Sequence, residues 1–235
     1  MAVHTPDRGE RRPPFDAQAA KRMREALGMT PAHVAYGINA AYGKPIQPRT
    51  IAAWERGEGS PTESELNALA GALWCAPGDL LGTPDTLREY RIARGIAADD
   101  LALRIGMEIP AYERMEATGQ WQGNDRQAAA LRAELDLPLP ALVRLTGRDR
   151  QLAEMLRSAA TTRWQAYTRP VGKLLGLPKP TVQKALEFLF EEYHRRMAGT
   201  LGWGGGVETA AESSDAGRDF LADVLTHFWE QVGEG

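Results

Sequence analysis

The sequence contains a single cysteine, Cys75, so it can form neither an internal disulfide nor a zinc site built from cysteines. We expect Cys75 to be a small buried hydrophobic residue. No stretch approaches the roughly 18 consecutive apolar residues that a membrane-spanning helix needs. Residues 1–16 lack the apolar core of a secretory signal. These absences favour a cytoplasmic protein with no membrane partner.

Catalytic signatures are missing as well. The four histidines are scattered and show no metal-ligand spacing. The chain has neither a phosphate-binding loop ending in Gly-Lys-Ser/Thr nor a Gly-x-Ser-x-Gly nucleophile motif. Paired carboxylates such as Asp99 and Asp100 fall at expected helix starts or on solvated helix faces. We therefore expect that the protein is not an enzyme and that it uses no metal and no cofactor.

The net charge of −3 hides an alternation of sign along the 235 residues, a length that predicts two or three folded units. Residues 1–60 carry a net charge of +3, residues 61–147 carry −5, residues 148–200 carry +5 and residues 201–235 carry −6. Two basic segments are thus separated by an acidic one. This distribution is compatible with a polyanionic partner, although the total charge is acidic.

The apolar spacing predicts an all-α protein, because alternating runs of β-branched residues are nearly absent. Residues 1–14 are polar and rich in proline and arginine, which indicates a disordered arm. Residues 17–82 fit five short helices, with N-caps at Thr30 and Thr62, the second in a capping-box pattern with Glu65.

The following segment repeats this plan. Its apolar positions and helix breaks come in the same order as those of the first segment, and Gly95 corresponds to Gly28. Such internal repeats decide an architecture. We therefore predict tandem five-helix units over residues 15–82 and 86–147, followed by a C-terminal helical region.

The C-terminal region begins with a basic helical segment, residues 148–199. We expect one helix over Arg150–Tyr167, an interruption at Pro170 and a second helix over Thr181–Met197. Residues 200–215 contain glycines and serines that indicate a linker. Residues 216–235 then predict an amphipathic helix, whose apolar face must dock on its own chain or on a second copy.

Three motifs stand out in the first unit, namely Lys21–Ala35, Pro48–Gly57 followed by Ser60-Pro61, and Leu69–Leu73. They resemble the helix-turn-helix domain of phage-repressor and Cro-type transcriptional regulators, the xenobiotic-response-element (XRE) family. The resemblance covers about 65 residues and implies that a recognition helix, here about residues 48–56, enters the major groove of DNA with its N-terminus first. The second unit is then a degenerate copy of this domain, in a protein from a GC-rich bacterium, as the excess of arginine over lysine also suggests.

The resemblance and the outward-facing positions together define a candidate set of DNA contacts. Arg49 can donate two hydrogen bonds to guanine, and alanine methyl groups can touch thymine methyl groups. Phosphate contacts are expected at the helix ends and at the free N–H groups that follow Thr30. The expected base contacts are Gln47, Arg49, Thr50, Ala52 and Ala53, and the expected phosphate contacts are Thr30, Lys44 and Arg56.

Glu55 lies on the inner flank of this helix, where an unpaired carboxylate would repel phosphate. The family resemblance implies that Arg24 pairs with Glu55, and the second unit keeps both charges as Arg91 and Glu116. We interpret both pairs as structural ion pairs and not as DNA contacts.

Six extra residues separate the second and third helices of the first unit, in the stretch 38–47, where the family has a tight turn. They either lengthen the second helix or form an excursion that brings Lys44 and Tyr42 against the DNA backbone.

The second unit is a poor face for DNA because it carries carboxylates where the first carries neutral or basic residues. It has Glu108, Ile109, Pro110 and Glu113 where the first has Gln47, Pro48, Arg49 and Ala52. We infer that this unit kept the fold and lost base recognition.

Residues 171–189 are similar to the helix-turn-helix core of winged-helix regulators. Gly176-Leu177-Pro178 would be the turn, and a possible second DNA surface would present Lys179, Gln183 and Lys184. The alternative is a basic helical hairpin that packs on other helices or on a second copy.

These patterns predict a sequence-specific transcriptional regulator of double-stranded DNA, located at the nucleoid and dimeric through its C-terminal helical region or its second domain. The alternative is an interaction module that uses repressor-like domains to hold another regulator or RNA polymerase. Operator sequence, regulated genes, direction of control, oligomeric state and any small-molecule effector are not encoded in these patterns.

Overall fold

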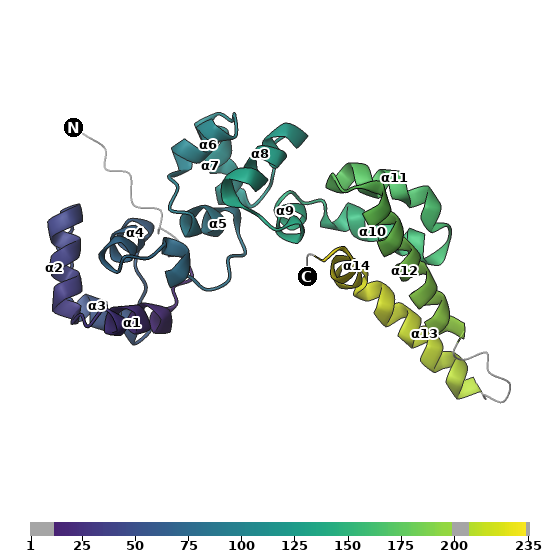
Figure 1. The fold of residues 1–235 in the computed structure, drawn as a ribbon, viewed down its shortest axis with the longest axis horizontal. Helices are drawn as coiled ribbons and strands as arrows, with labels where there is room; N and C mark the ends of the chain where they lie inside the picture. Colours follow the sequence, from purple (N-terminus) through teal and green to yellow (C-terminus); the bar gives the residue numbers. More distant parts are fainter. Residues whose placement is uncertain (1–11, 199–206, 234–235) are drawn as a thin grey trace. The chain divides into compact units, whose positions relative to one another are not determined.

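A computed structural model describes residues 12–198 and 207–233. Within these residues the protein is all-α, with fourteen α-helices, one short 3₁₀ helix and no strand beyond a single bridge between Phe15 and Leu81. The predicted fold class is thereby confirmed, whereas the tandem five-helix arrangement stays a prediction. The chain divides into two compact units after Gly119. Figure 1 labels the helices in their order along the chain. No helix in the described residues is long and apolar enough to cross a membrane.

Unit 1 extends to Gly119 and holds seven α-helices and the 3₁₀ helix. They are α1 (Ala17–Ala26), α2 (Pro31–Tyr42), α3 (Pro48–Glu55), α4 (Glu63–Ala72), η1 (Pro77–Leu80), α5 (Leu87–Ala93), α6 (Ala98–Arg104) and α7 (Ile109–Thr118).

The helix starts in unit 1 follow the predicted capping residues. The Thr30 hydroxyl accepts a hydrogen bond from the N–H of His33, and Thr62 forms a reciprocal capping box with Glu65. Each such cap contributes about 1 kcal/mol to helix stability. The fifth predicted helix of the first repeat is the 3₁₀ turn Pro77–Leu80, too short to be an α-helix.

One apolar core joins α1 to α5. Its largest buried side chains include Ile38 on α2, Ile51 and Trp54 on α3, Leu69 on α4 and Ile92 on α5. The segment before α1 is tied to the segment after η1, because the N–H of Gly82 donates a hydrogen bond to the carbonyl of Pro14 at 3.0 Å. Residues 12–14 of the predicted disordered arm are therefore placed against the fold, and residues 1–11 lie outside the described residues.

The six extra residues of the first repeat mostly lengthen a helix. Helix α2 has 12 residues whereas α6, at the matching place in the second repeat, has 7. The connection to the next helix is only one residue longer in the first repeat, where it covers residues 43–47, than in the second, where it covers residues 105–108. Tyr42, at the end of the lengthened helix, lies over Gly71 of α4, where an added methyl group would overlap its hydroxyl. Its hydroxyl is thus directed at α4, not at a DNA backbone.

Unit 2 begins at Gln120. Its helices are α8 (Asp125–Leu135), α9 (Leu139–Leu145), α10 (Asp149–Thr161), α11 (Trp164–Leu175), α12 (Lys179–Ala198), α13 (Val207–Ala222) and α14 (Val224–Val232).

The predicted helix over Arg150–Tyr167 is wrong, because the break falls at Thr162. The hydroxyls of Thr161 and Thr162 donate to carbonyls of the preceding turn, at 2.9 and 2.6 Å, and so compete with the helical backbone. Pro170 does not interrupt the chain and lies inside α11. The carbonyl that its missing N–H leaves unpaired belongs to Ala166, an exposed residue that water can reach.

The predicted linker over residues 200–215 is helical from Val207 onward, and its beginning lies outside the described residues. The single predicted C-terminal helix over 216–235 is in fact two helices, α13 and α14, which join at Asp223.

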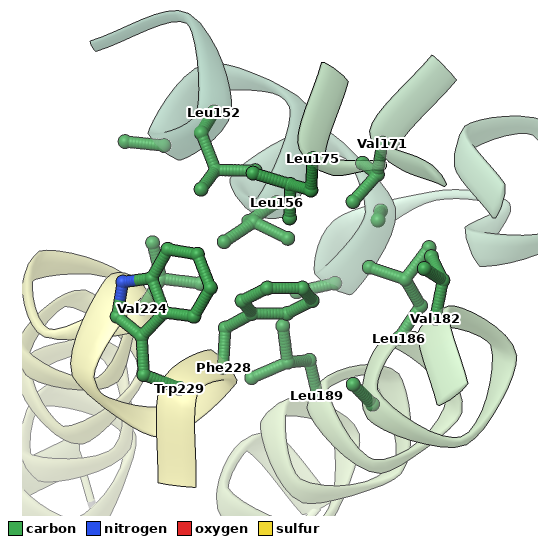
Figure 2. Close-up of a cluster of buried hydrophobic side chains, with 14 of the residues drawn as sticks. Leu152, Leu156, Val171, Leu175, Val182, Leu186, Leu189, Val224, Phe228 and Trp229 are labelled. Atoms are coloured by element: carbon green, nitrogen blue, oxygen red, sulfur yellow. The ribbon is translucent and has the colours of Figure 1, made fainter. Parts of the chain in front are cut away.

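The core of unit 2 is built mainly by α10, α11, α12 and α14 (Figure 2), and it also includes Leu139 and Val143 of α9 and Phe220 of α13. Phe228 and Trp229 of α14 point into a cluster of leucines and valines from α10, α11 and α12. Phe228 and Val224 are fully buried. Of the two predicted docking places for the last helix, its own chain is the one used, so this apolar face is not left for a second copy.

Candidate nucleic-acid interface

A buried ion pair joins α1 to α3. The guanidinium of Arg24 donates from Nε and Nη2 to the two carboxylate oxygens of Glu55, at 2.6 and 2.7 Å. Its Nη1 donates to the carbonyl of Met29 at 2.8 Å, which holds the turn after α1. The hydrogen bonds to Glu55 raise the pKa of Arg24 above its ordinary value. Glu55 is therefore neutralised at the base of α3 and does not face DNA as a free anion.

The second repeat forms the same pair with more partners. Arg91 donates to Glu116 on α7 at 2.6 Å and to the carbonyl of Ile96 at 2.8 Å, as Arg24 does in its own repeat. It also donates to Glu63 at the start of α4, at 2.5 Å. The hydroxyl of Tyr112 donates to Glu116 at 2.6 Å. Arg91 thus ties α4, α5 and α7 together, and Glu63 is a partner that the sequence pattern did not reveal.

The face of α3 matches the predicted recognition surface in exposure. Ile51 and Trp54 are buried inward, as their spacing of three residues requires. Gln47 and Arg49 are exposed, while three smaller residues are half-buried, namely Thr50, Ala52 and Ala53.

The polar groups at the start of α3 are free to bind a ligand. The Gln47 side chain makes no capping hydrogen bond although it precedes the helix. In the part of the chain that the structure describes, the Arg49 guanidinium has no hydrogen bond and no ion pair. Both groups can therefore meet base edges without first breaking an internal contact.

The phosphate site predicted after Thr30 is smaller than expected. Pro31 has no N–H, and the N–H of His33 is taken by the Thr30 hydroxyl at 3.2 Å. Among the described residues this leaves the N–H of Ala32 as the free donor at the start of α2. Lys44 is half-buried, in the connection that precedes α3.

Arg56 is not a free cation. Its guanidinium forms two hydrogen bonds with the carboxylate of Glu58, at 2.7 and 2.6 Å, on the exposed surface past the end of α3. The hydrogen bond from Arg56 lowers the pKa of Glu58, so this carboxylate is ionised at neutral pH. Glu58 therefore competes with a phosphate for Nε and Nη2 of Arg56, whereas Nη1 is not used by this pair, a competition that the Arg-Gly-Glu sequence could have suggested.

Exposed aromatic residues were missed at the sequence level. Tyr36 lies on α2 with 76% of its surface exposed, three residues after His33 and so on the same helix face. Trp74 follows α4 with 87% exposed, at a positive φ of 57° that few non-glycine residues adopt. The sequence pattern did not reveal that these two residues are exposed, because surface and core aromatic residues occur at the same helical spacing.

Helix α7 presents a different surface from α3. Tyr112 and Met115 take the inward places, and Glu108, Pro110 and Glu113 are exposed. Ile109 is half-buried between them. No basic residue stands where Arg49 stands in α3.

The predicted second DNA surface lies on unit 2, at the start of α12. Lys179 and Lys184 are exposed there, whereas Gln183 is half-buried. The turn predicted at Gly176–Pro178 is the connection between α11 and α12, and Gly176 has the positive φ, 67°, that glycine adopts at low cost.

A scan against protein-family models, a search of curated proteins and a search of solved structures each found no match to this chain. The functional proposal therefore depends on the residues themselves and on the resemblance of their motifs.

Two observations bear on other kinds of site. Within the described residues, no three His, Cys, Asp or Glu side chains are placed to hold a metal ion. Cys75 is half-buried, and its burial, together with the nearby Asp79, raises the pKa of its thiol to about 11. This thiol is a poor nucleophile at neutral pH.

Proposed function

We propose that the protein is a sequence-specific transcriptional regulator that binds double-stranded DNA, with α3 in the major groove as in XRE-type helix-turn-helix domains. The observation that carries the proposal is the surface of α3. An unpaired, exposed Arg49 stands at the start of a helix whose inner carboxylate, Glu55, is neutralised by Arg24.

In this proposal the residues at the start of α3 and on its outer face have different roles. Arg49 donates two hydrogen bonds to a guanine, a contact that discriminates against the wrong base by about 1–3 kcal/mol. Gln47 reads an adjacent base, Thr50 lies beside these two, and the methyl groups of Ala52 and Ala53 contact thymine. Lys44 and Ala32 face phosphates, and Arg56 joins them through the N–H groups that Glu58 does not take.

The proposal includes a dimer on a near-palindromic site in the cytoplasm, at the nucleoid. The buried face of α14 removes one candidate dimer surface. The second repeat and the outer surfaces of the other C-terminal helices are the candidates that are left.

The first test is a selection of bound fragments from a random DNA pool, run in parallel with the wild-type protein and Arg49→Ala. We expect the wild type to enrich a motif with a guanine and Arg49→Ala to lose or relax that position. The matched control is Arg114→Ala, which removes an exposed arginine from α7. If the wild type enriches no motif at physiological salt, the proposal is wrong.

A protein-interaction module is the second candidate function. It is favoured by the acidic face of α7 and by the neighbouring Leu103 on α6, which is 67% exposed. A polymerase subunit or another regulator would then be the partner. Salt separates the two functions, because DNA affinity that depends on phosphate contacts falls steeply as salt rises.

A further inference from the structure

The strongest unassigned feature of the molecule is a long basic segment in unit 2. Residues 155–186 contain six lysines and arginines and no aspartate or glutamate. One of the six, Arg157, donates to the carbonyl of Leu221 at 3.1 Å. The other five are exposed, and their side chains have no partner among the described residues, namely Arg163, Arg169, Lys173, Lys179 and Lys184. The α3 region offers fewer free cations, because Arg24 and Arg56 are both paired.

The helices carry these cations on their solvent side. The opposite face of α11 places Val171 and Leu175 in the core, and that of α12 places Val182 and Leu186 there (Figure 2). Arg169 and Lys173 are four residues apart, so they share one face of α11.

The connection between the two helices is tight. Gly176 ends α11, and the N–H of Leu177 donates to the carbonyl of Gly172 at 3.2 Å. Three residues, 176–178, separate α11 from α12, and Pro180 is the second residue of α12. This short turn brings the end of α11 next to the start of α12, with Lys173 on one side of it and Lys179 on the other.

We propose that this surface, α11 with the turn at Gly176 and the start of α12, is a second nucleic-acid site that binds the phosphate backbone of duplex DNA without regard to sequence. Lysine is a compact point charge that suits phosphate, whereas base recognition needs the planar groups of arginine or an amide. Lys179 and Lys184 are exposed at the start of α12, and Gln183, its amide, is half-buried.

Duplex DNA fits this surface better than a lipid membrane does. An interfacial membrane helix inserts large apolar residues beside its cations. In the described residues, every exposed large hydrophobic side chain lies in unit 1, so the basic surface of unit 2 has none. Exposed cations without apolar neighbours of this kind suit the phosphates that DNA presents along each strand.

The test uses the full chain and a labelled duplex of random sequence, with affinity measured by fluorescence anisotropy across a salt series. Each phosphate contact contributes about 0.9 to the slope of log affinity against log salt. We expect Lys179→Ala/Lys184→Ala to weaken binding about tenfold or more near 0.1 M salt and to reduce that slope by roughly 2. Arg169→Ala/Lys173→Ala should act in the same direction.

The matched control, Arg150→Ala/Arg195→Ala, removes the same net charge from unit 2 at exposed arginines already paired with Glu154 and Glu192. It should change affinity less than about twofold. The charge-conserving Lys179→Arg/Lys184→Arg should bind like the wild type. Equal losses in the control and the lysine variant, or no loss in either, would overturn the proposal.

This site is separate from the proposed function of α3, and the outcomes are distinguishable. If the proposal is correct, Lys179→Ala/Lys184→Ala weakens all duplexes alike and leaves the motif enriched from the random pool unchanged. Arg49→Ala alters the motif. If one of these two results is not obtained, the proposal that the other result tests is unaffected.

Discussion

Helix α3 turns Ile51 and Trp54 inward, and α7 turns Tyr112 and Met115 inward, at matching places of the two repeats. Each helix is also held at its inner flank by an arginine from the first helix of its repeat. Their outer faces differ in charge, because Glu108 and Glu113 of α7 replace Gln47 and Ala52 of α3.

The comparison separates the residues that build the helix pair from those that select its ligand. The arginine–glutamate pair and the two inward apolar residues recur. Removing one charge of the pair leaves the other buried without its partner, and removing an inward apolar side chain leaves a cavity. The outward residues are free to change because water solvates either version. The same ion pair and inward residues thus occur beside two outer faces of different charge, one with an exposed arginine and one with exposed carboxylates.

The largest expected effect tests the shared ion pair. Arg91→Met leaves Glu116, a buried carboxylate, without its guanidinium and removes one of the two arginines that hold Glu63, so it should destabilise unit 1 by about 3–5 kcal/mol. Arg24→Met should cost less, about 3 kcal/mol, because only the Glu55 carboxylate loses hydrogen bonds from a guanidinium, whereas Arg91 binds both Glu116 and Glu63. Urea unfolding followed by circular dichroism measures both losses. The exposed Arg22→Met is the control, and a greater loss for Arg24→Met than for Arg91→Met would contradict the expectation.

A smaller effect is expected when the α7 face is converted towards that of α3. Glu108→Gln/Glu113→Ala removes the two exposed carboxylates and should raise affinity for a random duplex at low salt, on the order of tenfold. The control, Asp99→Asn/Asp100→Asn, removes the same charge from the start of α6. If both double variants raise affinity equally, net charge and not the α7 face is responsible.

The smallest effect concerns pH. Burial alone would raise the pKa of Glu63, but the hydrogen bonds and charges of Arg91 and Arg88 outweigh it and hold that pKa below the ordinary 4.5. A lowered folded-state pKa contributes stability that is present above the unfolded value and is lost as pH falls through the folded value. Unfolding free energy should therefore be steady from neutral pH to about 4.5 and fall below it.

Glu63→Gln tests this assignment. It should cost about 1 kcal/mol at pH 7, since the amide still accepts hydrogen bonds, and should flatten the acid loss. Urea midpoints measured at several pH values check it, and an unchanged acid slope in Glu63→Gln would assign the pH dependence to other carboxylates.

The sequence predicted the local structure of the first repeat well because its signals are local. Thr62 and Glu65 are three residues apart and cap the same helix start, and Ile51 and Trp54 share one helix face at the same spacing. The prediction failed where hydroxyl groups compete with the backbone, as at Thr162, and where an exposed proline is tolerated, as at Pro170.

The sequence by itself determined the helical class, the caps, the inward face of each repeat and the charge of each segment, because all of these depend on residues within a few positions of one another. Only the tertiary structure decided which charges are free. Glu58 pairs with Arg56, and Glu63 is shared between Arg88 and Arg91. Within the described residues no partner is found for five cations, namely Arg163, Arg169, Lys173, Lys179 and Lys184. It also decided that α14 fills the core of its own chain. Pairing and docking depend on which side chains the fold brings within hydrogen-bond distance, and spacing along the chain does not encode that distance.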